Sequence, residues 1–167
     1  SLVTGATGFL GSAVMRCLLT AGHEVRVLVR ENSNLKNISN FPVEVFEGDL
    51  RNRMSLERAL ADCQNLFHVA ADYRLWVPDP DTMHAINVEG TRSLITAASN
   101  AGLEHIVYTS SVATLGLTAD GTPANEEAPC SLESVVGNYK RSKFLAEQVV
   151  KQLTQELSLP LVIVNPS

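Results

Sequence analysis

Tyr139 and Lys143 are the two residues of this chain whose types and spacing most directly suggest chemistry. They stand four positions apart, about one helical turn, so a helix would place the phenol and the ammonium on one face. A phenol, with a pKa of about 10, is a weak proton donor or base at neutral pH. A neighbouring ammonium stabilises the phenolate and brings that pKa toward the working range, which suits proton transfer. The same spacing also arises by chance on amphipathic helices.

A glycine-rich segment at 5–11, Gly-Ala-Thr-Gly-Phe-Leu-Gly, follows an apolar strand pattern and opens an amphipathic helix pattern. Strand-to-helix turns of this kind receive a dinucleotide pyrophosphate on backbone N–H groups and the helix N-terminus. Glycine triplets are also common in ordinary turns, but this position favours the dinucleotide. Together with Tyr139 and Lys143, the segment predicts oxidoreductase chemistry on a nicotinamide cofactor.

The residue at the end of the second strand separates NAD from NADP, because a carboxylate there binds the ribose 2′-hydroxyl whereas an arginine pairs with a 2′-phosphate. Arg30 holds this position and Glu31 follows it. The sequence therefore favours NADP; NAD is the alternative if Arg30 is a solvated surface residue and Glu31 takes the acidic role. Asp49, after the third strand, is a candidate acceptor for the adenine amino group or a loop-capping residue.

Composition narrows the class of protein. With 167 residues, a net charge of −5 and no dense Lys/Arg tract, the chain fits about one globular domain without a nucleic-acid or anionic-membrane surface. Apolar runs are far shorter than the ~20 residues of a membrane span, and no secretory leader precedes the glycine segment. Both ends fall beside strands, so we expect a piece of a longer protein.

The cysteine and histidine residues indicate structural roles. Three cysteines without a C-x-x-C pair exclude a disulfide framework and a cysteine-rich zinc site, so a reducing cytoplasm is expected. Cys17 falls in the helical pattern and is predicted to be a small core residue. His68 is predicted to be a strand or core histidine, because no ligand-spaced partner accompanies it. We expect no metal site.

The elements that must position these residues alternate along the chain. Strands are predicted at 1–4, 24–29, 43–47, 65–70, 105–109 and 161–164, and helices at 9–21, 55–60 with Ser55 as N-cap, 83–101 and 135–157. Helix-length crossovers imply a parallel, doubly wound α/β sheet of the Rossmann type, with strand order 3-2-1-4-5-6, over residues 1–167.

Six motifs together resemble the extended short-chain dehydrogenases/reductases, the NAD-dependent epimerase/dehydratase family. They occur in that family's order over essentially the whole chain, at 4–11, 48–50, 87–91, 109–111, 139–143 and 165–167. Segments 67–76 and 111–116 look closest to the hopanoid-associated sugar epimerases, a group similar to dihydroflavonol-4-reductases. The resemblance also implies a smaller C-terminal substrate domain, which is missing from this chain.

The resemblance implies that Tyr139 is the catalytic acid/base and that Lys143 tunes it and binds the ribose. Aligning the family's S-x-x-x-x-G on Gly116 makes Ser111 the catalytic serine, and Ser110 a cofactor neighbour or strand-end hydroxyl. The implied cofactor-binding residues are Gly5, Thr7, Gly8, Phe9, Leu10, Arg30, Asp49, Leu50, Ala70, Ala71, Asn87, Tyr139, Lys143, Pro166 and Ser167.

Some of these residues also have simpler interpretations. Asn87 either props the helix of the lysine or is a packed polar group inside its own helix, and Ala70 and Ala71 suit plain helix–sheet packing. The segment 72–76, with Asp72, Tyr73, Arg74 and Trp76, either contacts substrate or forms an ordinary surface loop.

The sequence thus predicts a cytoplasmic NADP(H)-dependent oxidoreductase that transfers hydride at a carbinol or ketone carbon of a small molecule, either a sugar nucleotide or a hydroxy-ketone. Arg30 favours a reductase, which consumes cofactor, whereas segment 72–76 favours an epimerase, which does not. Both stay open, as does assembly into a homodimer. The alternative from another class is a non-catalytic NAD(P)-sensing module, although such proteins usually lack the tyrosine.

Overall fold

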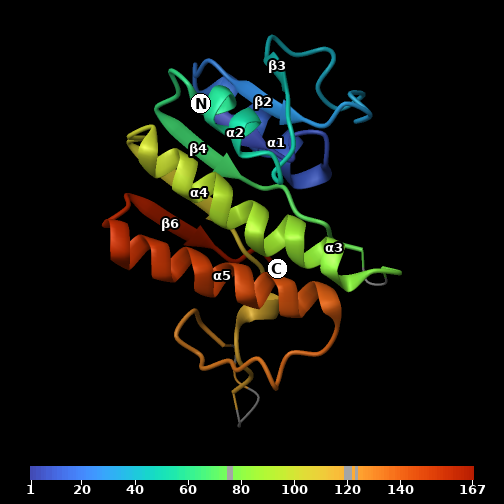
Figure 1. Ribbon diagram of the computed structural model, residues 1–167, viewed down its shortest axis with the longest axis vertical. Helices are drawn as coiled ribbons and strands as arrows, with labels where there is room; N and C mark the ends of the chain where they lie inside the picture. The colour runs from blue at the N-terminus through green and yellow to red at the C-terminus, as the bar shows by residue number, and fades with distance from the viewer. Residues whose placement is uncertain (75–76, 119–121, 123) are drawn as a thin grey trace.

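Short runs, several of them rich in valine, leucine and isoleucine, form the strands of one parallel sheet. The computed structural model describes residues 1–74, 77–118, 122 and 124–167, and within these the strands are β1 Leu2–Thr4, β2 Arg26–Val29, β3 Glu44–Glu47, β4 Asn65–His68, β5 His105–Thr109 and β6 Leu161–Val164. Their order is β3-β2-β1-β4-β5-β6, and all pairings are parallel (Figure 1). The predicted strand order and fold class are confirmed.

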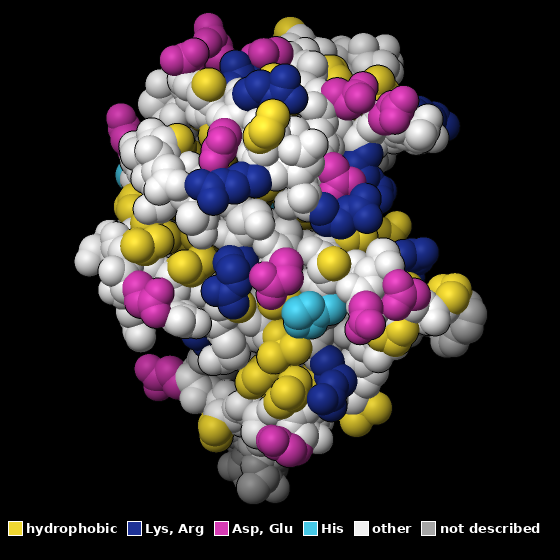
Figure 2. All heavy atoms as spheres, viewed as in Figure 1, with side chains coloured by type: hydrophobic (Ala, Val, Ile, Leu, Met, Phe, Trp, Pro, Cys, Tyr) yellow, Lys and Arg dark blue, Asp and Glu magenta, His cyan; other side chains and the backbone are white. Residues whose placement is uncertain are grey.

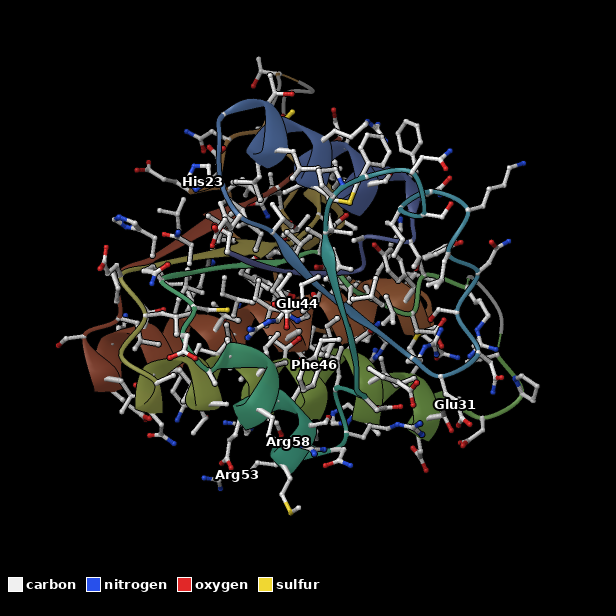
Figure 3. All side chains as sticks on the ribbon, turned by 90° about the horizontal axis from the view of Figure 1, so that it is seen from above. His23, Glu31, Glu44, Phe46, Arg53 and Arg58 are labelled. Atoms are coloured by element: carbon white, nitrogen blue, oxygen red, sulfur yellow. The ribbon has the colours of Figure 1, made fainter. Side chains whose placement is uncertain are left out.

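Helices cover both faces of the sheet. Figure 3 looks onto the β3 edge and shows α1 (Phe9–Thr20) on one face and α2 (Arg53–Leu60), α4 (Gly90–Asn100) and α5 (Asn138–Leu157) on the other. Because successive strand side chains point to opposite faces, Leu2 belongs to the core under α2, α4 and α5, and Val3 to the core under α1. Both are fully buried, so β1 lies at the centre of the molecule.

The edge strand β3 is charged rather than apolar. Glu44 pairs with Arg26 of β2 at 2.8 Å, and the same guanidinium lies 5.9 Å from the ring centre of Phe46 (Figure 3). Such charges discourage pairing with further strands. Positive and negative side chains are also interspersed over the face that carries α2, α4 and α5 (Figure 2). In the described part of the chain, the helices are all too short or too polar to cross a membrane.

The helix predicted at 83–101 is a composite. It consists of α3 (Pro80–His84), a π-helical turn η1 (Ala85–Glu89) and α4. A Cβ at Gly90 would lie 2.8 Å from the Cβ of Leu50, so glycine permits the close approach of this helix to the loop after β3. The π turn carries Asn87, and single π turns inside helices are frequent at functional sites.

Three local predictions were wrong. Cys17 is exposed, because the buried face of α1 is formed by Gly11, Ser12, Met15 and Leu18 instead. A Cβ at Gly11 would lie 2.1 Å from the carbonyl oxygen of Gly5, so this close contact fixes how α1 is rotated. The N-cap of α2 is Asn52, whose side chain accepts from Ser55 N at 3.2 Å, and not Ser55. Helix α5 begins at residue 138 rather than 135, after a glycine with positive φ.

Candidate active site

The glycine segment forms a tight turn between β1 and α1. Gly5 has a φ of 75°, and a Cβ there would lie 2.7 Å from the backbone nitrogen of Ala70. The Gly8 N–H donates to the Gly5 carbonyl at 3.0 Å, and Gly8 is the N-cap of α1. Gly8 and Phe9 are exposed at this helix N-terminus, where backbone dipoles leave partial positive charge. The turn is therefore a bare backbone cradle of the kind that fits a pyrophosphate.

Charged side chains gather after β2, β3 and β4. The Arg51 guanidinium donates to both carboxylate oxygens of Asp49, at 3.0 and 2.8 Å, and lowers the pKa of that carboxyl. Arg74 makes the equivalent pair with Asp72. The positive charge of Arg30 contributes to lowering the pKa of both carboxyls, so the arginine at the end of β2 lies close enough to act on the two neighbouring loops.

Lys143 is buried, with 3% of its surface exposed, and its ammonium points to the end of β5. The Nζ atom donates to the Tyr108 hydroxyl at 3.0 Å and to the Thr109 carbonyl at 2.8 Å. Burial lowers the pKa of Lys143 from 10.5 to about 8, against the negative charge of Glu147, which acts to raise it. A lysine held in this way is still protonated at neutral pH and titrates just above it.

Tyr139, which lies half-buried in the first turn of α5, is held through the backbone of that turn. Its carbonyl accepts from the Ser142 hydroxyl at 2.7 Å, and that hydroxyl accepts from Asn87 Nδ2 at 2.9 Å. Asn87 also bonds the backbone N–H and carbonyl of Asp72, at 2.7 and 2.8 Å. The buried asparagine thus ties the start of α5 to the loop after β4.

The two serines after β5 have different surroundings. The Ser110 hydroxyl is buried and donates to the Glu147 carboxylate. Ser111 is only partly buried; its Oγ accepts from Ala113 N at 3.1 Å and so caps the short 3-10 turn η2 (Val112–Thr114). Of the two hydroxyls, that of Ser111 is therefore the one that retains access to a ligand.

Further cofactor candidates line the same edge of the sheet. The Ala70 N–H donates to Thr4 Oγ1 at 3.2 Å and packs against Gly5, and Leu50 is buried against Gly90. Near the cradle, Leu10 is exposed at the start of α1, and the Thr7 carbonyl accepts from Asn37 at 2.7 Å. Ala71 is partly buried after β4. After β6, the Pro166 carbonyl accepts from Val112 N at 3.3 Å, and Ser167 is exposed.

Two predictions about neighbouring residues can be compared with the structure. His68 is a core histidine, as predicted: its ring nitrogens bond Thr4 Oγ1 at 2.7 Å and Thr91 Oγ1 at 2.9 Å, and burial lowers its pKa to about 3. Tyr73 is exposed, whereas Trp76 lies outside the described residues. In the described ranges, side chains that could bind a metal do not cluster in threes.

Sequence reasoning missed Tyr108 and Glu147. Tyr108 accepts from Lys143, and its own pKa is raised by burial and by the charge of Glu147. The i+4 spacing from Lys143 to Glu147 could have indicated Glu147, because it predicts that both residues share one face of α5. No comparable signal indicated Tyr108, which lies within the valine- and isoleucine-containing run of β5.

Residues from several of the predicted groups thus lie at the carboxyl ends of the strands, the edge at which doubly wound sheets bind ligands. The turn after β1 supplies the cradle, the loops after β2, β3 and β4 supply Arg30, Asp49 and Asp72, and the β5 end with α5 supplies Ser111 and Lys143.

Comparisons with known proteins agree with this geometry. A protein of Synechocystis sp., provisionally named dihydroflavonol 4-reductase, is 45% identical over 99% of this chain and 48% of its own length. The crystal structure of gox2253 superposes with a TM-score of 0.95 at 57% identity, over 99% of this chain and 50% of that one. The UDP-glucose 4-epimerase of Thermus thermophilus, in complex with NAD, gives 0.86 at 30% identity, over 98% and 53%.

The chain spans about half the length of curated relatives such as the Synechocystis protein. The family model that describes the NAD dependent epimerase/dehydratase family matches residues 1–167 in full. The chain therefore belongs to the NAD dependent epimerase/dehydratase family.

Proposed function

We propose that the protein to which this chain belongs is an NADP(H)-dependent carbonyl reductase, with Tyr139, Lys143 and Ser111 as its catalytic residues. The observation that carries the proposal is the buried Lys143 ammonium, which is held at the end of β5 one helical turn from Tyr139. Burying an ammonium is costly, so its retention at the end of β5, on the same helix as Tyr139, supports a catalytic role.

The cofactor, when bound, supplies a hydride at its nicotinamide ring. The backbone cradle at Gly5 and Gly8 would hold the pyrophosphate, and Arg30 would pair with a 2′-phosphate. Asp49 would accept from the adenine amino group, although Arg51 already donates to both of its carboxylate oxygens. Lys143 has two of its three N–H donors engaged by β5, which leaves one for the ribose.

The proton is the part of the reaction that this chain would supply. The Tyr139 hydroxyl gives its proton to the carbonyl oxygen as the carbonyl carbon accepts hydride, so a ketone becomes an alcohol. The Ser111 hydroxyl donates a hydrogen bond to the same oxygen, and the charge of Lys143 stabilises the phenolate left on Tyr139. Asn87 keeps the first turn of α5 in place during this transfer.

Two further observations favour a reductase over an epimerase. The first is the arginine at the end of β2, which suits NADP, the cofactor of most reductive steps. The second is that apolar side chains are exposed beside the site, with Val112 next to Ser111 and Val136 three residues before Tyr139. Such a rim suits a ketone with an apolar body. The Synechocystis relative, which is 45% identical to this chain, is also named a reductase. Nucleotide-sugar epimerisation is the second candidate, which the resemblance to the Thermus epimerase supports.

A cofactor-consumption assay tests the proposal. The full-length protein is incubated with NADPH or NADH and with either aromatic hydroxy-ketones or nucleotide sugars, and absorbance and product are followed together. Loss of one NADPH per alcohol formed supports the reductase. Product without net loss means an epimerase, and cofactor binding without any product means the sensing module.

Cofactor preference is tested at Arg30. The Arg30→Glu variant should bind NADPH at least ~10-fold more weakly while NADH binding changes little, because a charge-assisted pair to the 2′-phosphate is lost. Arg58→Glu, on the exposed face of α2 (Figure 3), is the matched control. Equal weakening for both cofactors would contradict the assignment of Arg30.

A further inference from the structure

Glu147 is a buried carboxylate that the proposed reaction does not use. It lies on α5, one turn after Lys143, with 3% of its surface exposed. Burial alone would raise the pKa of Glu147, but hydrogen bonds from Lys151, Ser110 and Thr114 outweigh that effect and hold the pKa below its ordinary value. The side chain is therefore an anion at neutral pH, although burying a charged group costs free energy unless the charge is paired and hydrogen-bonded.

The contacts of Glu147 reach three separate segments of the chain. Its Oε2 atom accepts from the Ser110 hydroxyl, from Thr114 Oγ1 at 2.7 Å and from Asn165 Nδ2 at 3.1 Å. Its Oε1 atom pairs with Lys151 Nζ at 2.7 Å at the surface of α5. One carboxylate thus joins the end of β5, the turn η2 and the residue after β6 to the helix that carries Tyr139.

These donors enclose Ser111 on both sides. Ser110 precedes it, and Thr114 ends the turn that Ser111 caps. The Ser111 carbonyl itself lies 2.7 Å from Thr114 Oγ1, whose single proton it shares with Glu147 Oε2, and it accepts from Asn165 Nδ2 at 3.1 Å. The position of Ser111 relative to α5 therefore depends on groups that all bond to the Glu147 carboxylate.

The same carboxylate acts on Lys143 through charge. The Lys143 ammonium faces the Tyr108 hydroxyl and the Thr109 carbonyl, both from β5. The ammonium also interacts electrostatically with Glu147 from its own helix and with His68 from β4. Burial lowers the pKa of Lys143, and among these groups Glu147 is the anion that acts to raise it. Loss of the negative charge should therefore make the ammonium lose its proton at lower pH.

We propose that Glu147 is a positioning residue: its carboxylate fixes the Ser111 turn and Asn165 to α5 and keeps a negative charge one helical turn from Lys143. The effect on turnover rests on the proposed function, whereas the effect on Lys143 is a property of the free protein. Glu147 touches no substrate, because its oxygens are enclosed by protein donors.

The test is Glu147→Gln in the full-length protein, because glutamine keeps the size of the side chain but removes the charge. The expected result is a fall in kcat of about 10- to 100-fold with KM for NADPH changed less than about 3-fold, and a basic limb of the pH profile displaced to lower pH by about one unit. Glu156→Gln, an exposed position on the same helix, is the control and should match the wild type.

A second readout needs no substrate. NMR of protein labelled with ¹⁵N-lysine follows the Lys143 Nζ signal with pH, and the same downward displacement is expected in Glu147→Gln. Ser110→Ala separates the two effects, since it removes one donor but keeps the charge. It should lower kcat without moving the Nζ titration.

The outcomes are distinguishable. An unchanged Nζ titration in Glu147→Gln would overturn the charge effect, and a wild-type kcat in either variant would overturn the positioning effect. If the wild-type protein turns over no ketone or sugar, the proposed function fails, while the NMR titration still decides the role of Glu147 toward Lys143. If Glu147→Gln does not fold, Ser110→Ala still decides the positioning effect, since a wild-type kcat there overturns it.

Discussion

Replacing Lys143 by methionine should change how the stability of the protein depends on pH. The ammonium has a pKa of about 8 when folded and 10.5 as its ordinary value. Between these values the unfolded chain holds a proton that the folded chain has released, so the free energy of unfolding rises with pH. Below about pH 8 the ammonium is charged in both states, and the full cost of burying it weighs against folding.

The size of this effect follows from the two pKa values. They differ by about 2.5, and at about 1.4 kcal/mol for each unit the burial cost is about 3.5 kcal/mol. Between pH 7 and pH 9 the linkage relation gives a rise of about 1.3 kcal/mol in the free energy of unfolding of the wild type. The Lys143→Met variant has no ammonium at this site, so the rise should be missing.

The assay is urea unfolding of the full-length protein without cofactor at several pH values, for the wild type, Lys143→Met and Lys140→Met. Lys140 is exposed on the same helix and serves as the control. Between pH 7 and pH 9 the free energy of unfolding of the wild type and of Lys140→Met should rise in parallel. For Lys143→Met the rise should be smaller by about 1.3 kcal/mol. Curves for Lys143→Met that run parallel to the wild type would refute the claim that the ammonium is buried.

Three further predictions concern the residues around the ammonium and the cradle. Gly5→Ala should abolish NADPH binding. Gly22→Ala, with a φ of 83° but open space around its Cβ, should lower the free energy of unfolding by only about 1 kcal/mol. Fluorescence titration with NADPH and thermal melting compare the two variants, and equal effects would contradict the close contact at Gly5. Asn87→Ala removes three hydrogen bonds and should lower the free energy of unfolding by about 2–3 kcal/mol. A loss below about 0.5 kcal/mol, measured by urea unfolding, would contradict the claim that Asn87 ties α5 to the loop after β4. Tyr108→Phe should displace the titration of the buried ammonium to lower pH by NMR, and Tyr73→Phe should not.

The fold was predictable because its signals are local. Apolar runs such as Leu161–Val164 and His105–Thr109 read as strands, and the helix-length segments between strands dictate parallel pairing. The strand order followed from this topology and the glycine segment. For the same reason, the predicted site residues could be expected at one edge of the sheet, since parallel strands all end there.

The missed features depend on contacts between segments far apart in the chain. The rotation of α1 is set by the contact of Gly11 with Gly5, so a purely hydrophobic pattern placed Cys17 inside. Glu147 collects donors from residues 110, 114 and 165, a convergence that no spacing along the chain reveals. The π turn at Ala85–Glu89 likewise has no sequence signature, although Asn87 within it was identified from its motif.

The most direct test of the account is the rate of hydride transfer by Tyr139→Phe. In a single turnover with bound NADPH and a ketone that the wild type reduces, removal of the phenolic proton should lower the rate constant about 10²- to 10⁴-fold, with the dissociation constant for NADPH changed less than about 2-fold. A rate constant equal to that of the wild type would contradict the role assigned to the tyrosine and to the lysine beside it.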